Sequence, residues 1–344
     1  MNKNPFTLTF GIKPEKYILR LSQSDQIISS FKNETNNVYM ITGVRGTGKT
    51  ALLTYISEHF ESLDNWIVIE LISEADMLDQ LASRLYDLGL FHKLFNGKTF
   101  GFSFQGLSFS IKGEKPVTNV VSLIEILLEK TLKNKRLLIC VDEAVNNKFM
   151  RPFVQTIQLL LRKKYPINLL MTGLYQNIYD LQNNESLTFL YRAPKISLEP
   201  LNIGSIAAEY ASIFKIEKEK AIELAKFTKG YAYAYQVLGY LLYENNKDCI
   251  DNYVLVQFDQ YMQDYVYDKI WSELSGNDKI LLKAFDKDAV MRVEDLLKRT
   301  SFGKKAFSVY RDRLIKRGLL ISPEYGKLRV KLPRFIEFIQ LQIM

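Results

Sequence analysis

A glycine-rich stretch near the start of the chain carries the residue types that bind a phosphate group. Residues 43–50 read GVRGTGKT and follow an apolar run at 38–41. Glycines let successive backbone N–H groups curl around an anion, and a helix that begins at the loop adds partial positive charge at its N-terminus. The helix-compatible sequence ALLTYISEHF comes next. This order of strand, loop and helix predicts a nucleoside triphosphate site.

The spacing G-x-x-x-x-G-K-[ST] assigns particular tasks within this stretch. Lys49 would reach the β and γ phosphates, and the Thr50 hydroxyl would ligate Mg²⁺. The backbone of the stretch would surround the phosphates. We therefore expect the nucleotide to be bound by Gly43, Val44, Arg45, Gly46, Thr47, Gly48, Lys49, Thr50 and Ala51.

An acidic pair follows a second apolar run at 137–141, LLICV. A continuous apolar run is typical of a parallel strand that is buried on both faces, and ligands of open α/β sheets lie at the carboxyl ends of such strands. Asp142 would hold Mg²⁺, directly or through water, and Glu143 would orient and deprotonate the attacking water. The alternative is a solvated acidic pair at a strand end.

Composition excludes several other kinds of chemistry. His59 and His92 are the only histidines, and both are isolated from metal-ligand spacings, so zinc hydrolysis and Ser-His or Cys-His catalysis lack the necessary residues. Guanine recognition is disfavoured because Asn246-Lys247-Asp248-Cys249 fails the N-K-x-D spacing. ATP with Mg²⁺ is the expected cofactor pair.

Strands and helices must alternate along the first 200 residues to position this site. Apolar runs predict five buried strands, the last of which follows Arg192, and helical periodicity predicts the helices between them. The strands are expected at 38–41, 65–71, 137–141 and 167–173, and the helices at 75–88, 120–132 and 151–164. This alternation predicts an α/β fold with a parallel sheet, the P-loop ATPase domain of residues 1–200.

Residues 201–274 are expected to form an all-α lid domain, because they show helical periodicity and no strand alternation. Helices are predicted at 203–214, 217–228, 231–243 and 253–274. Four tyrosines of the third helix could form a base-stacking surface, but no basic residue lies between 231 and 243, which favours packing within the lid. They are Tyr231, Tyr233, Tyr235 and Tyr240.

At 99–112 the spacing of the apolar residues changes from helical periodicity to strict alternation, which predicts a β-hairpin. Apolar residues alternate with small ones at 100–104, Gln105-Gly106 gives a turn, and the alternation resumes at 107–111. The apolar face of this hairpin would either extend the core or contact another subunit.

The positive charge of the chain is concentrated at its end. The net charge is +8, and residues 291–344 hold 13 basic and 5 acidic residues, so the rest of the chain is balanced. Helices are predicted at 276–285, 293–299 and 304–317, followed by strands at 319–322 and 327–332. This order is typical of a winged helix, which we place at residues 275–344 and expect to bind double-stranded DNA.

Outward-facing polar and basic residues define the predicted DNA surface. On the third helix and the wing these are Lys304, Lys305, Ser308, Arg313, Lys316, Lys327, Arg329 and Lys331. A recognition helix and a basic wing would enter a groove and grip the flanking phosphates. Asp312 lies in the same outward stripe and favours the alternative, a winged helix that contacts protein.

Three of these segments resemble known ATPase motifs. GVRGTGKT, LLICVDEA and INLLMTG are similar to Walker A, Walker B and sensor 1 of the AAA+ (ASCE-type) and related STAND ATPases. The order of elements, the helical lid and the winged helix resemble the archaeal-type ATPases, which are related to origin initiators. The resemblance covers nearly all of the chain.

The resemblance implies roles for two further residues, and the lid sequence departs from the family pattern. Thr172 would be the sensor 1 residue, and Arg192 an arginine finger that acts on a neighbouring subunit; the alternatives are an ordinary strand end and a surface arginine. A homo-oligomer would then form through Arg192 or the 99–112 hairpin. The lid stretch KGYAYAYQVLG has no sensor 2 arginine, and it shows Gly230-Tyr231-Ala232 in place of the Gly-x-Pro of STAND lids.

These features together predict a Mg²⁺-dependent switch protein that binds ATP and hydrolyses it slowly, with Glu143, Lys49, Thr172 and Arg192 as its catalytic residues. The alternative is a STAND-type signalling or scaffold ATPase. No apolar run approaches the roughly 20 residues that span a bilayer, and Cys140 and Cys249 form no disulfide framework. We expect a cytoplasmic protein without a membrane segment.

Overall fold

The computed structural model describes residues 3–9, 14–88, 119–286 and 289–342. The hairpin predicted at 99–112 lies outside the described residues. The chain divides into two compact units. The sheet unit comprises Leu21–Thr42 and Leu52–Ser197, and the lid unit comprises Met1–Arg20, Gly43–Ala51 and Leu198–Met344.

The sheet unit is built on five parallel strands in the order β2-β3-β4-β1-β5. The strands are β1 (Val38–Thr42), β2 (Trp66–Ile72), β3 (Arg136–Asp142), β4 (Ile167–Gly173) and β5 (Lys195–Ser197). Ile41 of β1 lies opposite Thr172 of β4, and Val141 of β3 lies opposite Met171. The predicted strands and their parallel pairing are confirmed.

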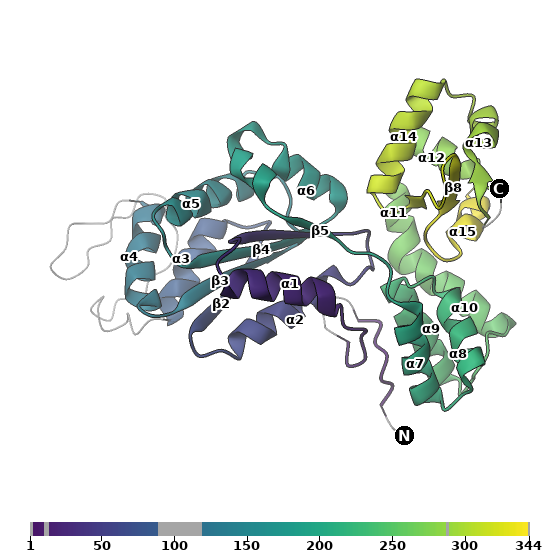
Figure 1. Ribbon diagram of the computed structural model, residues 1–344, viewed down its shortest axis with the longest axis horizontal. Helices are drawn as coiled ribbons and strands as arrows, with labels where there is room; N and C mark the ends of the chain where they lie inside the picture. Colours follow the sequence, from purple (N-terminus) through teal and green to yellow (C-terminus); the bar gives the residue numbers. More distant parts are fainter. Residues whose placement is uncertain (1–2, 10–13, 89–118, 287–288, 343–344) are drawn as a thin grey trace. The chain divides into compact units, whose positions relative to one another are not determined.

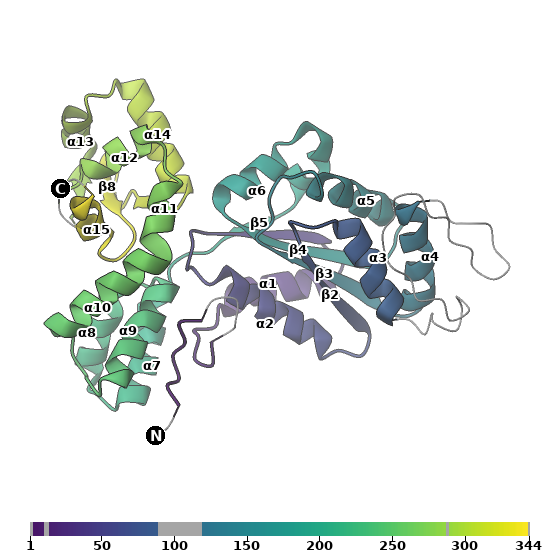
Figure 2. The same ribbon diagram turned by 180° about the vertical axis from the view of Figure 1, so that it is seen from behind.

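Helices cover both faces of this sheet (Figure 1). They are α1 (Leu21–Lys32), α2 (Lys49–Glu61), α3 (Met77–Leu88), α4 (Val120–Leu132), α5 (Met150–Arg162) and α6 (Tyr175–Gln182), with a 3₁₀ helix η2 (Glu185–Arg192) after α6. Figure 2 shows from behind that α1 and α2 lie on one face and α3 to α6 on the other.

Successive residues of each strand contribute to opposite faces. Met40 and Ile139 belong to the core under α3 to α6. Tyr39 points to the other face, where its ring centroid lies 5.6 Å from that of Phe31 in α1. All five residues of β1 are buried. Apolar residues on both faces explain why the central strands read as continuous apolar runs.

The helical part of the lid unit contains α7 (Ile203–Phe214), α8 (Lys218–Phe227), α9 (Ala232–Glu244), α10 (Asn252–Met262) and α11 (Asp268–Ser272). The helix predicted over 253–274 is confirmed in substance, because the chain is helical from 252 to 272; the sequence did not predict the π-helical turn η3 (Gln263–Tyr267) between α10 and α11. The π turn adds a residue, so Val266 and Tyr267 can both face the core.

The C-terminal module (residues 275–341) combines four helices with a small antiparallel sheet in the order β6-β8-β7. Its elements are α12 (Gly276–Lys283), β6 (Met291–Arg292), α13 (Val293–Thr300), α14 (Lys304–Lys316), β7 (Leu320–Ile321), β8 (Lys327–Val330) and α15 (Phe335–Leu341). A capping box of Ser275 and Asp278 starts α12. The sequence did not predict β6 and α15.

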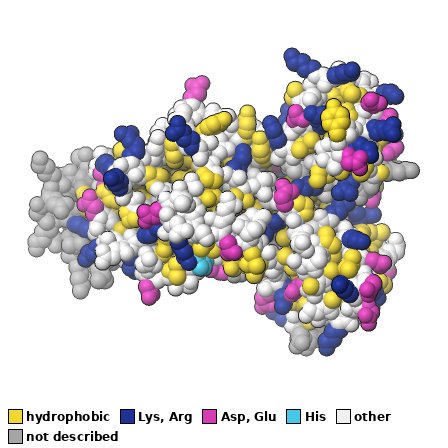
Figure 3. All heavy atoms as spheres, in the orientation of Figure 1, with side chains coloured by type: hydrophobic (Ala, Val, Ile, Leu, Met, Phe, Trp, Pro, Cys, Tyr) yellow, Lys and Arg dark blue, Asp and Glu magenta, His cyan; other side chains and the backbone are white. Residues whose placement is uncertain are grey.

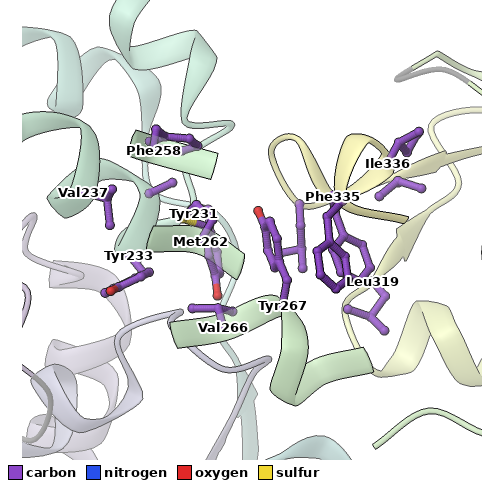
Figure 4. Packing of buried hydrophobic residues seen from close by; sticks show 14 of the residues in the cluster. Tyr231, Tyr233, Val237, Phe258, Met262, Val266, Tyr267, Leu319, Phe335 and Ile336 are labelled. Carbon is purple, nitrogen blue, oxygen red and sulfur yellow. The ribbon is translucent and has the colours of Figure 1, made fainter. Parts of the chain in front are cut away.

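One hydrophobic core runs through the lid helices and the C-terminal module. Figure 4 shows Tyr267 of η3 beside Phe335 of α15, with Met262 and Val266 on the lid side. The ring centroids of Tyr267 and Phe335 are 4.8 Å apart, and the Tyr267 hydroxyl donates to the carbonyl of Pro333. The predicted boundary at 274 therefore falls within a continuous core.

In the described ranges, no helix combines the length and the apolar character needed to cross a membrane.

Candidate nucleotide site and basic surface

The phosphate loop (residues 43–48) follows β1 directly and leads into α2. The Lys49 Nζ atom lies 3.1 Å from the carbonyl oxygens of both Gly43 and Val44. Gly46 and Gly48 have φ values of +72° and +88°, in the left-handed region that favours glycine. Lys49, Thr50 and Ala51 occupy the first turn of α2, where backbone N–H groups have no partner within the helix.

The side chain of Arg45 is engaged within the lid unit. Its guanidinium lies 3.0 Å from the carboxylate of Glu273, and both side chains are partly exposed. Lys269 approaches the same carboxylate at 3.6 Å. The Arg45 side chain thus connects the phosphate loop to the end of α11. Only the backbone of Arg45 is therefore expected to bind a phosphate.

The carboxyl ends of β3 and β4 hold three predicted site residues together. Thr172 is fully buried, and its hydroxyl donates to the Asp142 carboxylate. The amide of Glu143 lies 3.0 Å from Asp142 Oδ1 and 3.4 Å from Thr172 Oγ1. The Thr172 hydroxyl thus orients Asp142.

The backbone of Glu143 adopts a conformation that is unusual for a residue with a side chain. Its φ is +51°, and the side chain is exposed. Such a conformation costs about 1 kcal/mol or more and persists only where the surroundings enforce it. The hydroxyl of Ser73 donates to the Glu143 carbonyl at 3.0 Å, and the Ala144 amide donates to the Thr172 carbonyl at 2.7 Å. These bonds hold the backbone of Glu143 in this conformation, in which its side chain is exposed.

Ser73 and Asn147 help to position the loop that carries Glu143, and neither was predicted from the sequence. Ser73 follows β2, and its carbonyl accepts a bond of 2.8 Å from the Asn147 side chain. The single oxygen of the same side chain accepts from the amides of Phe149 and Met150, where α5 begins. An asparagine just before a helix was the available signal for Asn147. Nothing in the sequence distinguished Ser73 from other serines at strand ends.

The strands that carry these residues end at one edge of the sheet. Thr42 is paired with Gly173, and Val141 with Met171, so β1, β4 and β3 terminate side by side. The chain passes from Thr42 into the phosphate loop. Asp142 offers a carboxylate at this edge of the sheet, and Thr50 offers a hydroxyl in the first turn of α2; each is an oxygen ligand of the kind that Mg²⁺ prefers.

Arg20, which the sequence analysis did not select, also contacts the phosphate loop. Its guanidinium donates to the carbonyl of Thr47 at 3.0 Å and to that of Glu199 at 2.6 Å. Burial lowers the pKa of Arg20 to about 10, so the side chain stays protonated at neutral pH.

Arg192 is the last residue of η2, and Ala193 and Pro194 separate it from β5. Its side chain is exposed and takes part in no ion pair with the described residues.

Half of the predicted DNA-facing residues are exposed and form no ion pair within the described ranges. They are Lys304, Lys305, Lys316 and Arg329. The alternation in β8 is as predicted, because Leu328 and Val330 are buried while Arg329 is exposed. In Figure 3, Lys and Arg side chains are spread over the C-terminal module on the face shown, with Asp and Glu side chains among them.

Other predicted members of this surface have partners within the protein. Arg313 makes bonds of 2.9 and 2.6 Å to the carboxylate of Asp278, whose side chain is 1% exposed. The expectation that Arg313 faces DNA is therefore corrected, because its guanidinium neutralises a buried charge. Lys327 pairs with Glu324 at 2.6 Å.

Lys331 and Ser308 are also engaged. Lys331 pairs with Glu199 at 3.0 Å, and the hydroxyl of Ser308 accepts a bond of 3.1 Å from Arg311.

The comparisons with known proteins show the fold. A family model described as a domain of unknown function (DUF8462) matches residues 264–339. Among proteins with curated descriptions, none matches this sequence. Solved structures resemble the chain over nearly its whole length.

Three archaeal structures illustrate the likeness. The Aeropyrum pernix ORC2 protein, in ADPNP-ADP complexes, is 14% identical, with 98% of this chain and 99% of that chain covered and a TM-score of 0.61. The Walker-type ATPase of Pyrococcus abyssi is 14% identical, with 95% and 96% covered and a TM-score of 0.62. Cdc6p from Pyrobaculum aerophilum is 14% identical, with 98% of each chain covered and a TM-score of 0.51.

Proposed function

Because the chain has the AAA+ fold of the ORC and Cdc6 type, we propose that it is a Mg²⁺-dependent ATPase switch that acts in the cytoplasm. The observation that carries this proposal is the arrangement of Asp142, Thr172 and Glu143 at the edge where β1 enters the phosphate loop. A phosphate-binding loop, a metal-binding carboxylate and an exposed base are the groups that hydrolysis of ATP requires.

Each residue has a defined task in this proposal. The backbone of the phosphate loop and Lys49 bind the triphosphate, and Thr50 and Asp142 hold Mg²⁺, which neutralises charge on the phosphates when bound. The Glu143 carboxylate accepts a proton from the attacking water. The Thr172 hydroxyl keeps Asp142 oriented, so its sensor role would act through this bond.

Arg192 supports an oligomeric form of the switch. Its exposed guanidinium would stabilise charge on the transferred phosphoryl group of a neighbouring subunit. Removal of a finger of this kind slows turnover without a comparable loss of ATP affinity.

A binding experiment tests the nucleotide site. Titration with a fluorescent ATP analogue should show that Lys49→Ala weakens binding about 10- to 100-fold, because a charge-assisted contact to phosphate is lost. Lys148→Ala removes an exposed lysine elsewhere and should leave affinity unchanged. Chelation of Mg²⁺ should stop turnover. Equal affinity of Lys49→Ala and the wild type would refute the site.

We further propose that the C-terminal module is a winged helix that binds double-stranded DNA. The exposed cations of α14 and β8 support this, together with the concentration of the excess positive charge in residues 291–344. Lys304, Lys305, Lys316 and Arg329 would contact phosphates.

A STAND-type signalling ATPase is the second candidate, and exposed apolar residues of the same module favour it. Val309 in α14 is 56% exposed, and Tyr325 at the turn before β8 is fully exposed. Both could contact a protein. Duplex affinity measured over a salt series separates the two functions: DNA binding predicts a steep fall with salt, and protein recognition predicts weak affinity at every salt concentration.

A further inference from the structure

Three successive carbonyl groups of the phosphate loop accept hydrogen bonds from donors outside the loop. The hydroxyl of Tyr231 donates to the carbonyl of Arg45, and the amide of Tyr233 donates to that of Gly46 at 2.9 Å. Arg20 donates to the carbonyl of Thr47 at 3.0 Å. Two of these donors belong to the start of α9 in the lid.

The start of α9 also fits the loop sterically. A Cβ atom added at Gly46 would lie 2.3 Å from the Tyr231 hydroxyl oxygen and 3.0 Å from the Cβ of Tyr233. Only glycine therefore permits this approach, in addition to the left-handed backbone that Gly46 adopts.

Tyr231 is itself held firmly. The side chain is buried, and burial raises the pKa of its hydroxyl, which therefore keeps its proton and can donate. Its amide donates to the carbonyl of Thr228 at 2.9 Å. Gly230, with φ +72°, precedes it and accepts a bond of 2.7 Å from the Leu201 amide. Figure 4 shows Tyr231 beside Met262 in the core of the lid unit.

The direction of these bonds bears on phosphate binding. The N–H and C=O groups of a peptide unit point in opposite directions, so a loop whose carbonyls are fixed on one side presents its N–H groups on the other. We propose that Tyr231 is a positioning residue, whose hydroxyl holds the phosphate loop in its anion-binding conformation from the lid. This inference rests on the proposed binding of ATP.

The proposal supplies a connection between nucleotide and lid that needs no sensor 2 arginine. If the lid stabilises the loop conformation that binds phosphate, then bound nucleotide must stabilise this lid contact by the same free energy. Because the lid core continues into the C-terminal module, the connection extends to that module.

Tyr267 provides a matched control. Its hydroxyl is also buried in this core and also donates to a backbone carbonyl, that of Pro333, which lies outside the phosphate loop. If Tyr231 were only a buried tyrosine with a satisfied hydroxyl, Tyr231→Phe and Tyr267→Phe would have the same effects.

The test compares wild type, Tyr231→Phe and Tyr267→Phe by titration with a fluorescent ATP analogue in Mg²⁺ and by thermal unfolding without nucleotide. We expect both variants to unfold at slightly lower temperature, and only Tyr231→Phe to raise the dissociation constant, about 3- to 10-fold. Unchanged affinity of Tyr231→Phe, or equal weakening by both variants, would overturn the proposal. Absence of binding by the wild type would refute the proposed function as well.

A second measurement needs no variant. Hydrogen exchange of the wild type should show that Mg²⁺-ATP slows exchange of the backbone amides at residues 228–239, in addition to those of the phosphate loop. Protection of the loop alone would show that the Tyr231 contact does not respond to nucleotide, and would overturn the proposal while leaving ATP binding intact.

Discussion

At the scale of single residues, Thr172 connects the two acidic residues that follow one another at the end of β3. Its hydroxyl donates to Asp142 and lies within reach of the Glu143 amide. A carboxylate that is oriented by a neighbour binds a metal with less loss of freedom, and such supporting groups contribute strongly to activity. The buried hydroxyl is therefore part of the proposed metal site without being a ligand.

We predict that Thr172→Val lowers Mg²⁺-dependent ATP turnover about 10- to 100-fold, because Asp142 loses the donor that orients it. ATP affinity should change much less, because the phosphate loop is intact. Steady-state kinetics over a Mg²⁺ series would show a raised Mg²⁺ requirement. Wild-type turnover in this variant would argue against the orienting role.

The matched control for Thr172→Val is Thr131→Val. The Thr131 hydroxyl is buried and has no hydrogen-bond partner among the described residues, so its removal leaves no partner unsatisfied. We expect the free energy of unfolding of Thr131→Val to lie within about 0.5 kcal/mol of the wild-type value or slightly above it, with normal turnover.

At the scale of elements, α14 carries cations with two different tasks. Arg313 faces α12 and neutralises Asp278, which is buried and also caps that helix. Lys316, one turn further along, is exposed and unpaired within the described residues. The same helix thus contributes to the internal structure of the module through one cation and to its surface through another.

Substitutions in α14 should separate these two tasks. Arg313→Ala leaves the buried Asp278 carboxylate without its cation and should destabilise the protein by about 3 kcal/mol. Lys316→Ala should change stability by less than about 0.5 kcal/mol and weaken duplex binding. Urea unfolding and duplex titration of both variants check this, and a stable Arg313→Ala variant would contradict the structural role.

The strands and the sequence motifs could be predicted, because each depends on residues close together in the chain. The continuous apolar runs of β1, β3 and β4 and the spacing of residues 43–50 are such local signals. The pairing of Arg313 with Asp278 and the contact of Tyr231 with Arg45 join residues far apart in sequence. The π turn at 263–267 depends on core packing, which helical periodicity does not report.

At the scale of the whole molecule, the lid and the C-terminal module share a core and contact the phosphate loop together. Arg45 pairs with Glu273, and a Cβ added at Gly318 would lie 3.8 Å from the Cβ of Val44. Because one core joins them, we expect lid and module to respond to nucleotide as one body, so ATP should alter duplex affinity.

The slope of log binding constant against log salt concentration reports the number of phosphate contacts, and each contact contributes about 0.9 to its magnitude. We predict that the magnitude of this slope falls by about 3 to 4 when Gln replaces Lys304, Lys305, Lys316 and Arg329. The control replaces four exposed lysines elsewhere: Lys133, Lys135, Lys148 and Lys218. Both variants lose the same charge. If the magnitude of the slope falls equally in the two, binding follows net charge, and the DNA contacts cannot be assigned to α14 and β8.

The most direct test of the central claim is the turnover of Glu143→Gln measured beside its affinity for ATP. The substitution keeps the size of the side chain and removes the base. We predict that the dissociation constant for ATP stays within about twofold of the wild type, while hydrolysis slows at least about 100-fold. Equal turnover by Glu143→Gln and the wild type would contradict the assignment of Glu143 as the base, because hydrolysis would then not depend on this carboxylate.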